Sequence, residues 1–170
     1  QYRVRLPDAT VMQPDRVLTV DGRDIVCAYV ELGSPGLPHL AVELPELADV
    51  TDDDLRALAR ALRYHPALPK GANVNFYTLT GKDAVLLRTY ERGVEDFTCA
   101  CGTGTGAVVS VLTLAGRVSG TAVRVKMRGG VLTMDVTARD GTARDLFLTG
   151  PARLVARGEV FEEELLKNEI

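Results

Sequence analysis

The chain is dominated by short segments in which polar and apolar residues alternate. A two-residue period is typical of strands with one buried face, and clusters of Gly, Pro, Asn and Asp separate the segments. Pro7, Asp8 and Pro14 break the alternation early in the chain. The pattern predicts strands over 2–6, 16–20, 23–32, 40–44, 73–79, 84–90, 123–127, 131–136, 146–148 and 152–155. The fifth and sixth of these form a hairpin.

The segment from Gly33 to Pro38 interrupts the strand pattern. Gly33 to Pro38 contains two glycines and two prolines, and proline cannot donate a hydrogen bond inside a central strand. We therefore predict a loop here, with His39 at its exit, immediately before the strand over 40–44.

Two segments carry helical signals of opposite kinds. Thr51 is a good N-cap followed by three aspartates, and apolar residues then recur with a helical period, which predicts a surface helix over 51–63. Ala107 to Ala115 is an apolar run, so a helix over 103–116 is expected to be buried all round. A weak helical pattern covers 161–166. The predicted class is α+β, with antiparallel or mixed strands wrapped around a central buried helix and one surface helix outside.

Composition and charge narrow the range of partners. The 170 residues are 46% hydrophobic, which suits one globular domain, and the 20 basic and 23 acidic residues are scattered, so nucleic acid is not an expected partner. No apolar run reaches the roughly 20 residues of a membrane helix, and no signal-peptide pattern opens the chain. We expect a cytoplasmic protein with no membrane partner. Gln1 in place of Met indicates a piece of a longer polypeptide.

The candidate chemistry lies where a polar, glycine-rich loop opens into the apolar helix. Cys101 precedes Gly102-Thr103-Gly104, so its sulfur meets free N–H groups and the positive end of the helix dipole, and both favour the thiolate. A ligand carboxylate can approach the same small residues. Spacing alone leaves a second interpretation open, in which Cys101 is a small buried apolar residue.

Other sites fit this segment less well. The glycines lack the Gly-Lys-Ser/Thr ending of a phosphate-binding loop, and Cys99-x-Cys101 is too tight for a zinc knuckle and has no second pair. Neither a phosphate-binding loop nor a zinc knuckle is therefore expected here. Three cysteines are too few for a disulfide scaffold, and Cys27 and Cys99 are interpreted as core or loop thiols.

Several motifs together resemble the diaminopimelate epimerase family. Glu-Arg-Gly at 91–93 followed by Thr-Cys-Ala-Cys-Gly-Thr-Gly at 98–104 is similar to the family's Glu-Arg-Gly and Thr-x-x-Cys-Gly-Thr/Ser-Gly helix start. Asn-Val-Asn-Phe at 73–76, Tyr-His-Pro at 64–66 and Thr-Gly-Pro at 149–151 also match, in order. The resemblance covers almost the whole chain, from Tyr2 to the tail, so residues 1–170 would form only the second of the family's two pseudo-symmetric lobes.

The resemblance implies an enzyme without pyridoxal phosphate or metal. Each lobe places strands around a central helix and lends one cysteine to a cleft, so that one thiolate removes the α-proton while the opposite thiol returns another. Cys101 would be one acid/base, with the Gly102 and Thr103 N–H groups on the reacting carboxylate. The implied reaction interconverts LL- and meso-diaminopimelate, in lysine and cell-wall precursor biosynthesis.

Further site residues follow from the same resemblance. Glu91 and Arg92 would read the amino and distal carboxylate ends of the substrate, Asn73 would bind the distal end, and His39 would lie near the thiols. Two alternatives stay open: Glu91 and Arg92 as an exposed pair at a strand end, and His39 as a packing residue beside Pro38.

The loop before His39 departs from the family's Gly-Asn-Pro-His pattern. An apparent three-residue insertion leaves Ser34 or Leu37 in place of the asparagine. The alternatives are therefore a racemase of another amino acid, such as histidine, or a lobe that binds an amino acid without turnover.

The expected partners are a small amino-acid substrate and the first lobe of the same protein. The tail over 158–170 is expected to pack toward that lobe. Without the first lobe, bare apolar faces favour self-association, for example as a homodimer, and the 170-residue chain is expected to be inactive.

Overall fold

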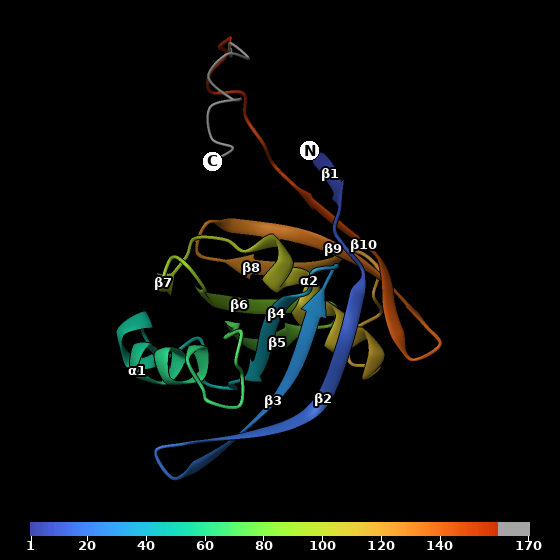
Figure 1. Ribbon diagram of the computed structural model, residues 1–170. Helices are drawn as coiled ribbons and strands as arrows, with labels where there is room; N and C mark the ends of the chain where they lie inside the picture. Colours follow the sequence, from blue (N-terminus) through green and yellow to red (C-terminus); the bar gives the residue numbers. More distant parts are fainter. Residues whose placement is uncertain (160–170) are drawn as a thin grey trace, which may run out of the picture.

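The computed structural model describes residues 1–159, which form one curled sheet and two helices (Figure 1). The helices are α1 (Asp52–Arg63) and α2 (Gly102–Leu114). The strands are β1 (Tyr2–Arg5), β2 (Ala9–Val20), β3 (Arg23–Leu32), β4 (Leu37–Glu43), β5 (Asn73–Gly81), β6 (Ala84–Glu91), β7 (Asp96–Phe97), β8 (Val123–Met127), β9 (Gly130–Arg139) and β10 (Thr142–Gly150). The predicted α+β class is confirmed.

The sheet curls around α2. Its order is β1-β10-β9-β8-β6-β5-β4-β3-β2, with β7 added beside β6. β4 pairs with β5 and β6 pairs with β8 in parallel, and the other neighbours are antiparallel. β1 and β2 stand at the two ends of this order and are consecutive in the chain, so the polypeptide itself joins the two margins of the curl (Figure 1).

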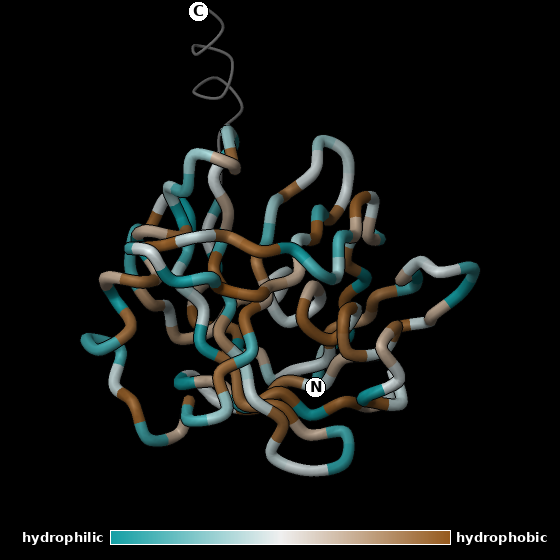
Figure 2. The backbone as a smooth tube through the Cα atoms, turned by 90° about the horizontal axis from the view of Figure 1, so that it is seen from below, coloured by the Kyte–Doolittle hydropathy of each residue, from teal (hydrophilic) through white to brown (hydrophobic). Residues whose placement is uncertain are grey.

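The sheet separates two hydrophobic cores. We call the core around α2 the inner core; it includes Val108, Val109 and Leu112 of the helix and residues from both halves of the sheet. The outer core lies under α1, whose buried side chains are Leu55, Ala59 and Leu62. Figure 2 shows hydrophobic stretches along the central strands and hydrophilic residues at many of the turns.

Both helix predictions that fall within residues 1–159 are confirmed, with small changes at their ends. Thr51 caps α1: its side chain accepts from the Asp54 N–H, and the Asp54 carboxylate accepts from the Thr51 N–H, which completes a capping box. α2 has no charged residue in its first turn and is buried along most of its length. Its last turn is less enclosed, because Val111, Thr113 and Leu114 are only half-buried.

Two strand predictions are wrong. Pro14 does not break the second strand: β2 continues through it, because β2 stands at a margin of the sheet and the register shifts between Gln13 and Arg16. Residues 152–155 are not a strand; they extend beyond β10, with Leu154 82% and Val155 92% exposed. The predicted helix over 161–166, and most of the predicted tail over 158–170, lie outside the described residues.

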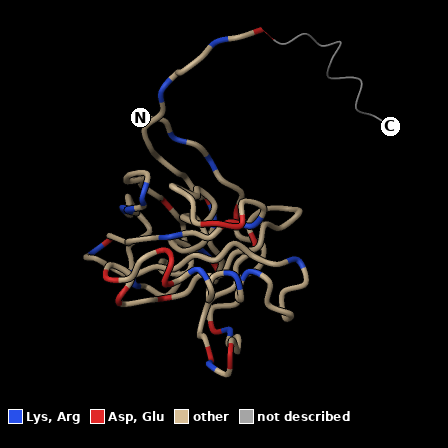
Figure 3. The backbone as a smooth tube through the Cα atoms, turned by 90° about the vertical axis from the view of Figure 1, so that its left-hand side faces the viewer, with Lys and Arg blue, Asp and Glu red and all other residues tan. Residues whose placement is uncertain are grey.

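The two ends of the described chain leave the fold side by side. Tyr2 pairs with Gly150 and Arg5 pairs with Phe147, so β1 and β10 run together to the same end of the sheet. Basic and acidic residues are interspersed along the backbone (Figure 3). Within residues 1–159, neither helix is long and apolar enough to cross a membrane.

Candidate active site

Cys101 is the N-cap of α2. Its backbone is extended, and its sulfur accepts a hydrogen bond from the Gly104 N–H at 3.3 Å and lies 3.6 Å from Thr103 Oγ1. The thiol is 6% exposed. A helix leaves its first N–H groups without partners inside the helix, so the N–H groups of Gly102 and Thr103 point out of the same helix end. The sequence therefore places a thiol and backbone donors together.

Polar residues of the sheet gather around this helix start. Side chains alternate along a strand, and Ala41, Tyr77 and Leu87 belong to the inner core. The residues two and four positions closer to the start of α2 consequently share that inner face. They are His39 on β4, Asn73 and Asn75 on β5, and Thr89 and Glu91 on β6.

Asn75 and Thr89 lie directly against the first turn of α2. A Cβ added at Gly104 would lie 2.3 Å from Asn75 Oδ1 and 3.1 Å from Thr89 Oγ1, so only glycine fits here. The Thr89 hydroxyl donates to Asn75 Oδ1 at 2.9 Å. Strands β5 and β6 thus contact the start of α2 at Gly104, the residue whose N–H donates to the Cys101 sulfur.

Glu91 lies beside the thiol. Its carboxylate accepts a short hydrogen bond from the Thr98 hydroxyl. Burial raises the pKa of the Cys101 thiol; the Gly104 N–H and Thr103 hydroxyl lower it, and the Glu91 carboxylate raises it further. The N–H group at the helix start therefore favours the thiolate as expected, but burial outweighs it, and the net shift of the pKa is upward.

Asn73 and Arg92 are joined through the main chain. The Asn73 amide donates to the Pro38 carbonyl at 3.3 Å, and its oxygen accepts from the Arg92 N–H at 2.8 Å. The Arg92 guanidinium is exposed and donates to the Lys70 carbonyl at 3.0 Å. Asn73 thus fixes the backbone of Arg92, whose guanidinium extends into solvent.

His39 does not lie at a loop exit. The loop ends at Gly36, and His39 is the third residue of β4, fully buried and paired in register with Asn73. Its Nε2 atom has no hydrogen-bond partner among the described residues. Burial, and then the charge of Arg92, lower the pKa of His39 from 6.5 to about 3, so the ring is uncharged near neutral pH.

The structure brings all seven predicted site residues to one end of the sheet and adds two that the sequence analysis did not single out, Asn75 and Thr89. A signal for Asn75 is present in the sequence: Asn73 and Asn75 are two residues apart in a strand and so share a face. Thr89 carries no comparable signal, because only the pairing of β5 with β6 places it opposite Asn75.

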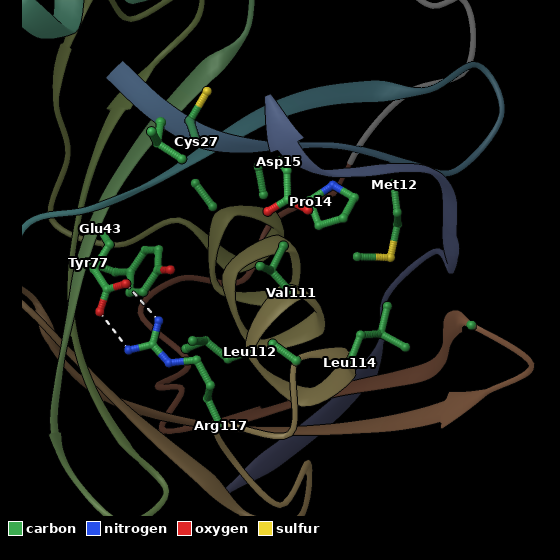
Figure 4. A pocket seen from close by; sticks show the side chains of 15 residues that line it. Met12, Pro14, Asp15, Cys27, Glu43, Tyr77, Val111, Leu112, Leu114 and Arg117 are labelled. Atoms are coloured by element: carbon green, nitrogen blue, oxygen red, sulfur yellow. Dashed lines mark hydrogen bonds and ion pairs between the residues drawn. The ribbon is translucent and has the colours of Figure 1, made fainter. Parts of the chain in front are cut away.

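The other end of α2 is different in kind. A cavity of about 640 Å³ lies there, lined largely by apolar side chains from β2, β3 and the last turns of α2 (Figure 4). Two of its charged groups are paired, since Arg117 makes two 2.6 Å hydrogen bonds to the Glu43 carboxylate. Cys27 lines this cavity, and burial raises the pKa of its thiol to about 11.

Comparison with known proteins identifies the family. The family profile for diaminopimelate epimerase matches residues 32–155. The chain belongs to the diaminopimelate epimerase family. It is 39% identical to the diaminopimelate epimerase of Aquifex aeolicus over 153 residues, covering 89% of this chain and 52% of that protein. It is 40% identical to that of Archaeoglobus fulgidus over 145 residues, covering 85% and 47%. The chain spans about half the length of these relatives.

Solved structures share the fold of this family member. A hydroxyproline epimerase from Agrobacterium vitis superposes with a TM-score of 0.62 at 19% identity, covering 86% of this chain and 48% of that one. A probable proline racemase from Agrobacterium radiobacter gives 0.61 at 17% identity, covering 86% and 49%. The α+β fold predicted from the strand and helix pattern is therefore a known architecture.

Proposed function

We propose that this chain is the C-terminal lobe of an amino-acid epimerase that interconverts LL- and meso-diaminopimelate. The observation that carries the proposal is the position of Cys101, whose sulfur caps α2 at 3.3 Å from the Gly104 N–H with the Glu91 carboxylate beside it. The motif resemblance, the family membership and the names of the relatives support the substrate.

In this proposal Cys101 exchanges a proton with the α-carbon from one face. As base, the thiol first gives its proton to the neighbouring Glu91 carboxylate, and the thiolate then takes the α-proton. As acid, the thiol gives its proton to the α-carbon, and burial keeps it protonated until then. Inversion needs a second thiol on the opposite face, with the two roles reversed by direction.

The negative charge that develops on the substrate needs fixed donors in a closed site. The N–H groups of Gly102 and Thr103 at the positive end of α2 supply them for the reacting carboxylate. Arg92, extended from the backbone that Asn73 holds, receives the distal carboxylate. Because Cys101 is already sheltered, closure by a second body need exclude little further water.

The opposite thiol comes from a first lobe in this proposal. Cys27 is unsuitable because it lines the cavity at the far end of α2. Cys99 is exposed on the loop before Cys101 and belongs to the same side of the cleft. The 170-residue chain alone is therefore expected to show no epimerase turnover, and its joining to a first lobe should restore it.

The test is exchange of the α-proton of diaminopimelate in deuterated water. The full-length protein should incorporate deuterium and interconvert the isomers, and Cys101→Ala should lower the rate by about 10³-fold. Cys99→Ala, a neighbouring exposed thiol, is the matched control and should retain full activity. If another amino acid in a panel exchanges its α-proton and diaminopimelate does not, that amino acid is the substrate. Full activity in Cys101→Ala would refute the proposal.

A further inference from the structure

The side-chain amide of Asn75 has only one orientation that satisfies its neighbours. Its nitrogen lies 2.8 Å from the Leu40 carbonyl, which can only accept a hydrogen bond. Its oxygen accepts from the Thr89 hydroxyl at 2.9 Å. A flipped amide would place two oxygens against each other at Leu40. The –NH₂ group is therefore fixed on the Leu40 side.

This orientation also fixes the hydrogen positions on His39. The same Asn75 nitrogen lies 3.3 Å from His39 Nδ1. One of its two hydrogens goes to Leu40 and the other points to the ring. An –NH₂ group cannot accept, so Nδ1 must be the unprotonated nitrogen, and a neutral ring then carries its proton on Nε2.

The resulting N–H is available to a ligand. Nε2 is buried and has no partner among residues 1–159, and His39 is on the inner face of β4, at the end of the sheet where Cys101 lies. A buried donor without a partner costs free energy, which a site recovers when a ligand supplies the acceptor.

We propose that Asn75 is a positioning residue that holds His39 as the uncharged Nε2–H tautomer, so that this ring donates a hydrogen bond to an anionic group in the cleft. The role of His39 in catalysis rests on the proposed function, whereas the tautomer assignment rests on the hydrogen bonds alone. His39 then serves as a donor, and a proton-accepting role for Nε2 in the resting protein is excluded.

The first test is nitrogen NMR of the wild-type chain labelled with ¹⁵N-histidine. The sequence has two histidines. His65 is an internal reference, because its Nδ1 accepts from the Ala67 N–H at 3.2 Å and its Nε2 lies 3.2 Å from the Thr19 carbonyl. Both rings should give the pyridine-type signal at Nδ1 and the pyrrole-type signal at Nε2. A protonated Nδ1 on His39 would overturn the proposal without any variant.

Two substitutions then test the role of Asn75. Asn75→Asp keeps the shape and replaces the donor by an acceptor, so His39 should become protonated at Nδ1, while His65 is unchanged. Thr89→Val removes the hydroxyl but leaves the Asn75 nitrogen in place, so the tautomer of His39 should persist. An unchanged His39 spectrum in folded Asn75→Asp would refute the assignment.

Kinetics connect the tautomer to turnover. In the full-length protein, Asn75→Asp should lower kcat by about 10²-fold or more, the scale expected for a misplaced proton at a catalytic centre. A wild-type protein without epimerase activity would end the proposed function but leave the tautomer assignment intact. An active Asn75→Asp protein with a switched tautomer would refute the catalytic use alone.

Discussion

The two helices begin with the same cap geometry and opposite surroundings. The side chain of Thr51 accepts the Asp54 N–H at the start of α1, and the side chain of Cys101 accepts the Gly104 N–H at the start of α2. In both cases the N-cap residue holds the third N–H of the helix. The geometry is shared, but the capping atom is oxygen in one helix and sulfur in the other.

The difference in charge is larger. α1 has three aspartates in its first turn, so the positive end of its dipole is already compensated by its own side chains. α2 has no acidic residue of its own there; its first turn rests on the uncharged side chains of Asn75 and Thr89, and the nearby carboxylate is that of Glu91 on β6. The positive end of α1 is therefore compensated by acidic residues of the same helix, whereas the start of α2 can still bind an anion. Each prediction below changes one side of this comparison.

The largest effect is expected when sulfur is exchanged for oxygen. Serine caps a helix as well as threonine does, so Cys101→Ser should change the free energy of unfolding by less than about 0.5 kcal/mol. A serine hydroxyl is a far weaker acid than a thiol, so epimerase turnover should fall by about 10³-fold, or about 4 kcal/mol of barrier. Urea unfolding and deuterium exchange measure the two quantities. A large loss of stability would show that the cap depends on sulfur.

A second substitution closes the space between α2 and the sheet. Alanine ordinarily favours a helix over glycine by about 1 kcal/mol, but at Gly104 its Cβ would lie 2.3 Å from Asn75 Oδ1. We expect Gly104→Ala to lower the free energy of unfolding by about 1–3 kcal/mol, the usual cost of overpacking. Urea denaturation checks this. An increase in stability would show that the Asn75 side chain moves away without loss.

The free energy of unfolding should fall in acid because of His39. The pKa of His39 is lowered to about 3 in the folded state, so the unfolded chain binds more protons between that value and 6.5. This contribution to stability is present above pH 6.5 and is lost as pH falls, by up to about 1.4 kcal/mol per pH unit. The urea midpoint of the wild-type protein should fall between about pH 7 and about pH 5, and in His39→Gln this fall should be smaller. Equal slopes in both proteins would contradict the burial of an uncharged ring.

The smallest effect is expected at the start of α1. Thr51→Ala removes the acceptor of the Asp54 N–H and should cost about 1 kcal/mol of stability, whereas Thr51→Ser should cost almost nothing. Because α1 covers the outer core, neither variant should alter turnover of the full-length protein. Thermal unfolding together with the exchange assay tests both statements. Loss of turnover in Thr51→Ser would show that the two helix starts are coupled.

The sequence predicted the elements whose signals are local. The cap and aspartates at the start of α1 and the glycine-rich start of α2 located both helices to within one or two residues at each end. Alternation located the hairpin of β5 and β6. The motif around Cys101 also indicated the end of the sheet at which the predicted site residues gather.

The remaining features depend on distant contacts. The loop before His39 appears longer in sequence than in structure, because alternation does not report that Leu37 and Pro38 pair antiparallel with β3, so that β4 begins at Leu37. The contacts of Asn75 with His39 and Thr89 join residues 36 and 14 positions apart. Desolvation of Cys101 likewise follows from packing around α2, which the motif alone does not reveal.

The pairing of β1 with β10 has a mechanical consequence. Gly150 and Tyr2 lie at the Cys101 end of the sheet, since a Cβ at Gly102 would lie 3.0 Å from Leu148 of the same strand. The backbone that enters the sheet at Tyr2 and the backbone that leaves it after Gly150 therefore lie together at this end. In the proposed two-lobe protein, these two hydrogen-bonded strands form a double tether, which keeps the first lobe at high effective concentration beside the Cys101 end of the sheet and limits its rotation. Closure over a small ligand is then an intramolecular step.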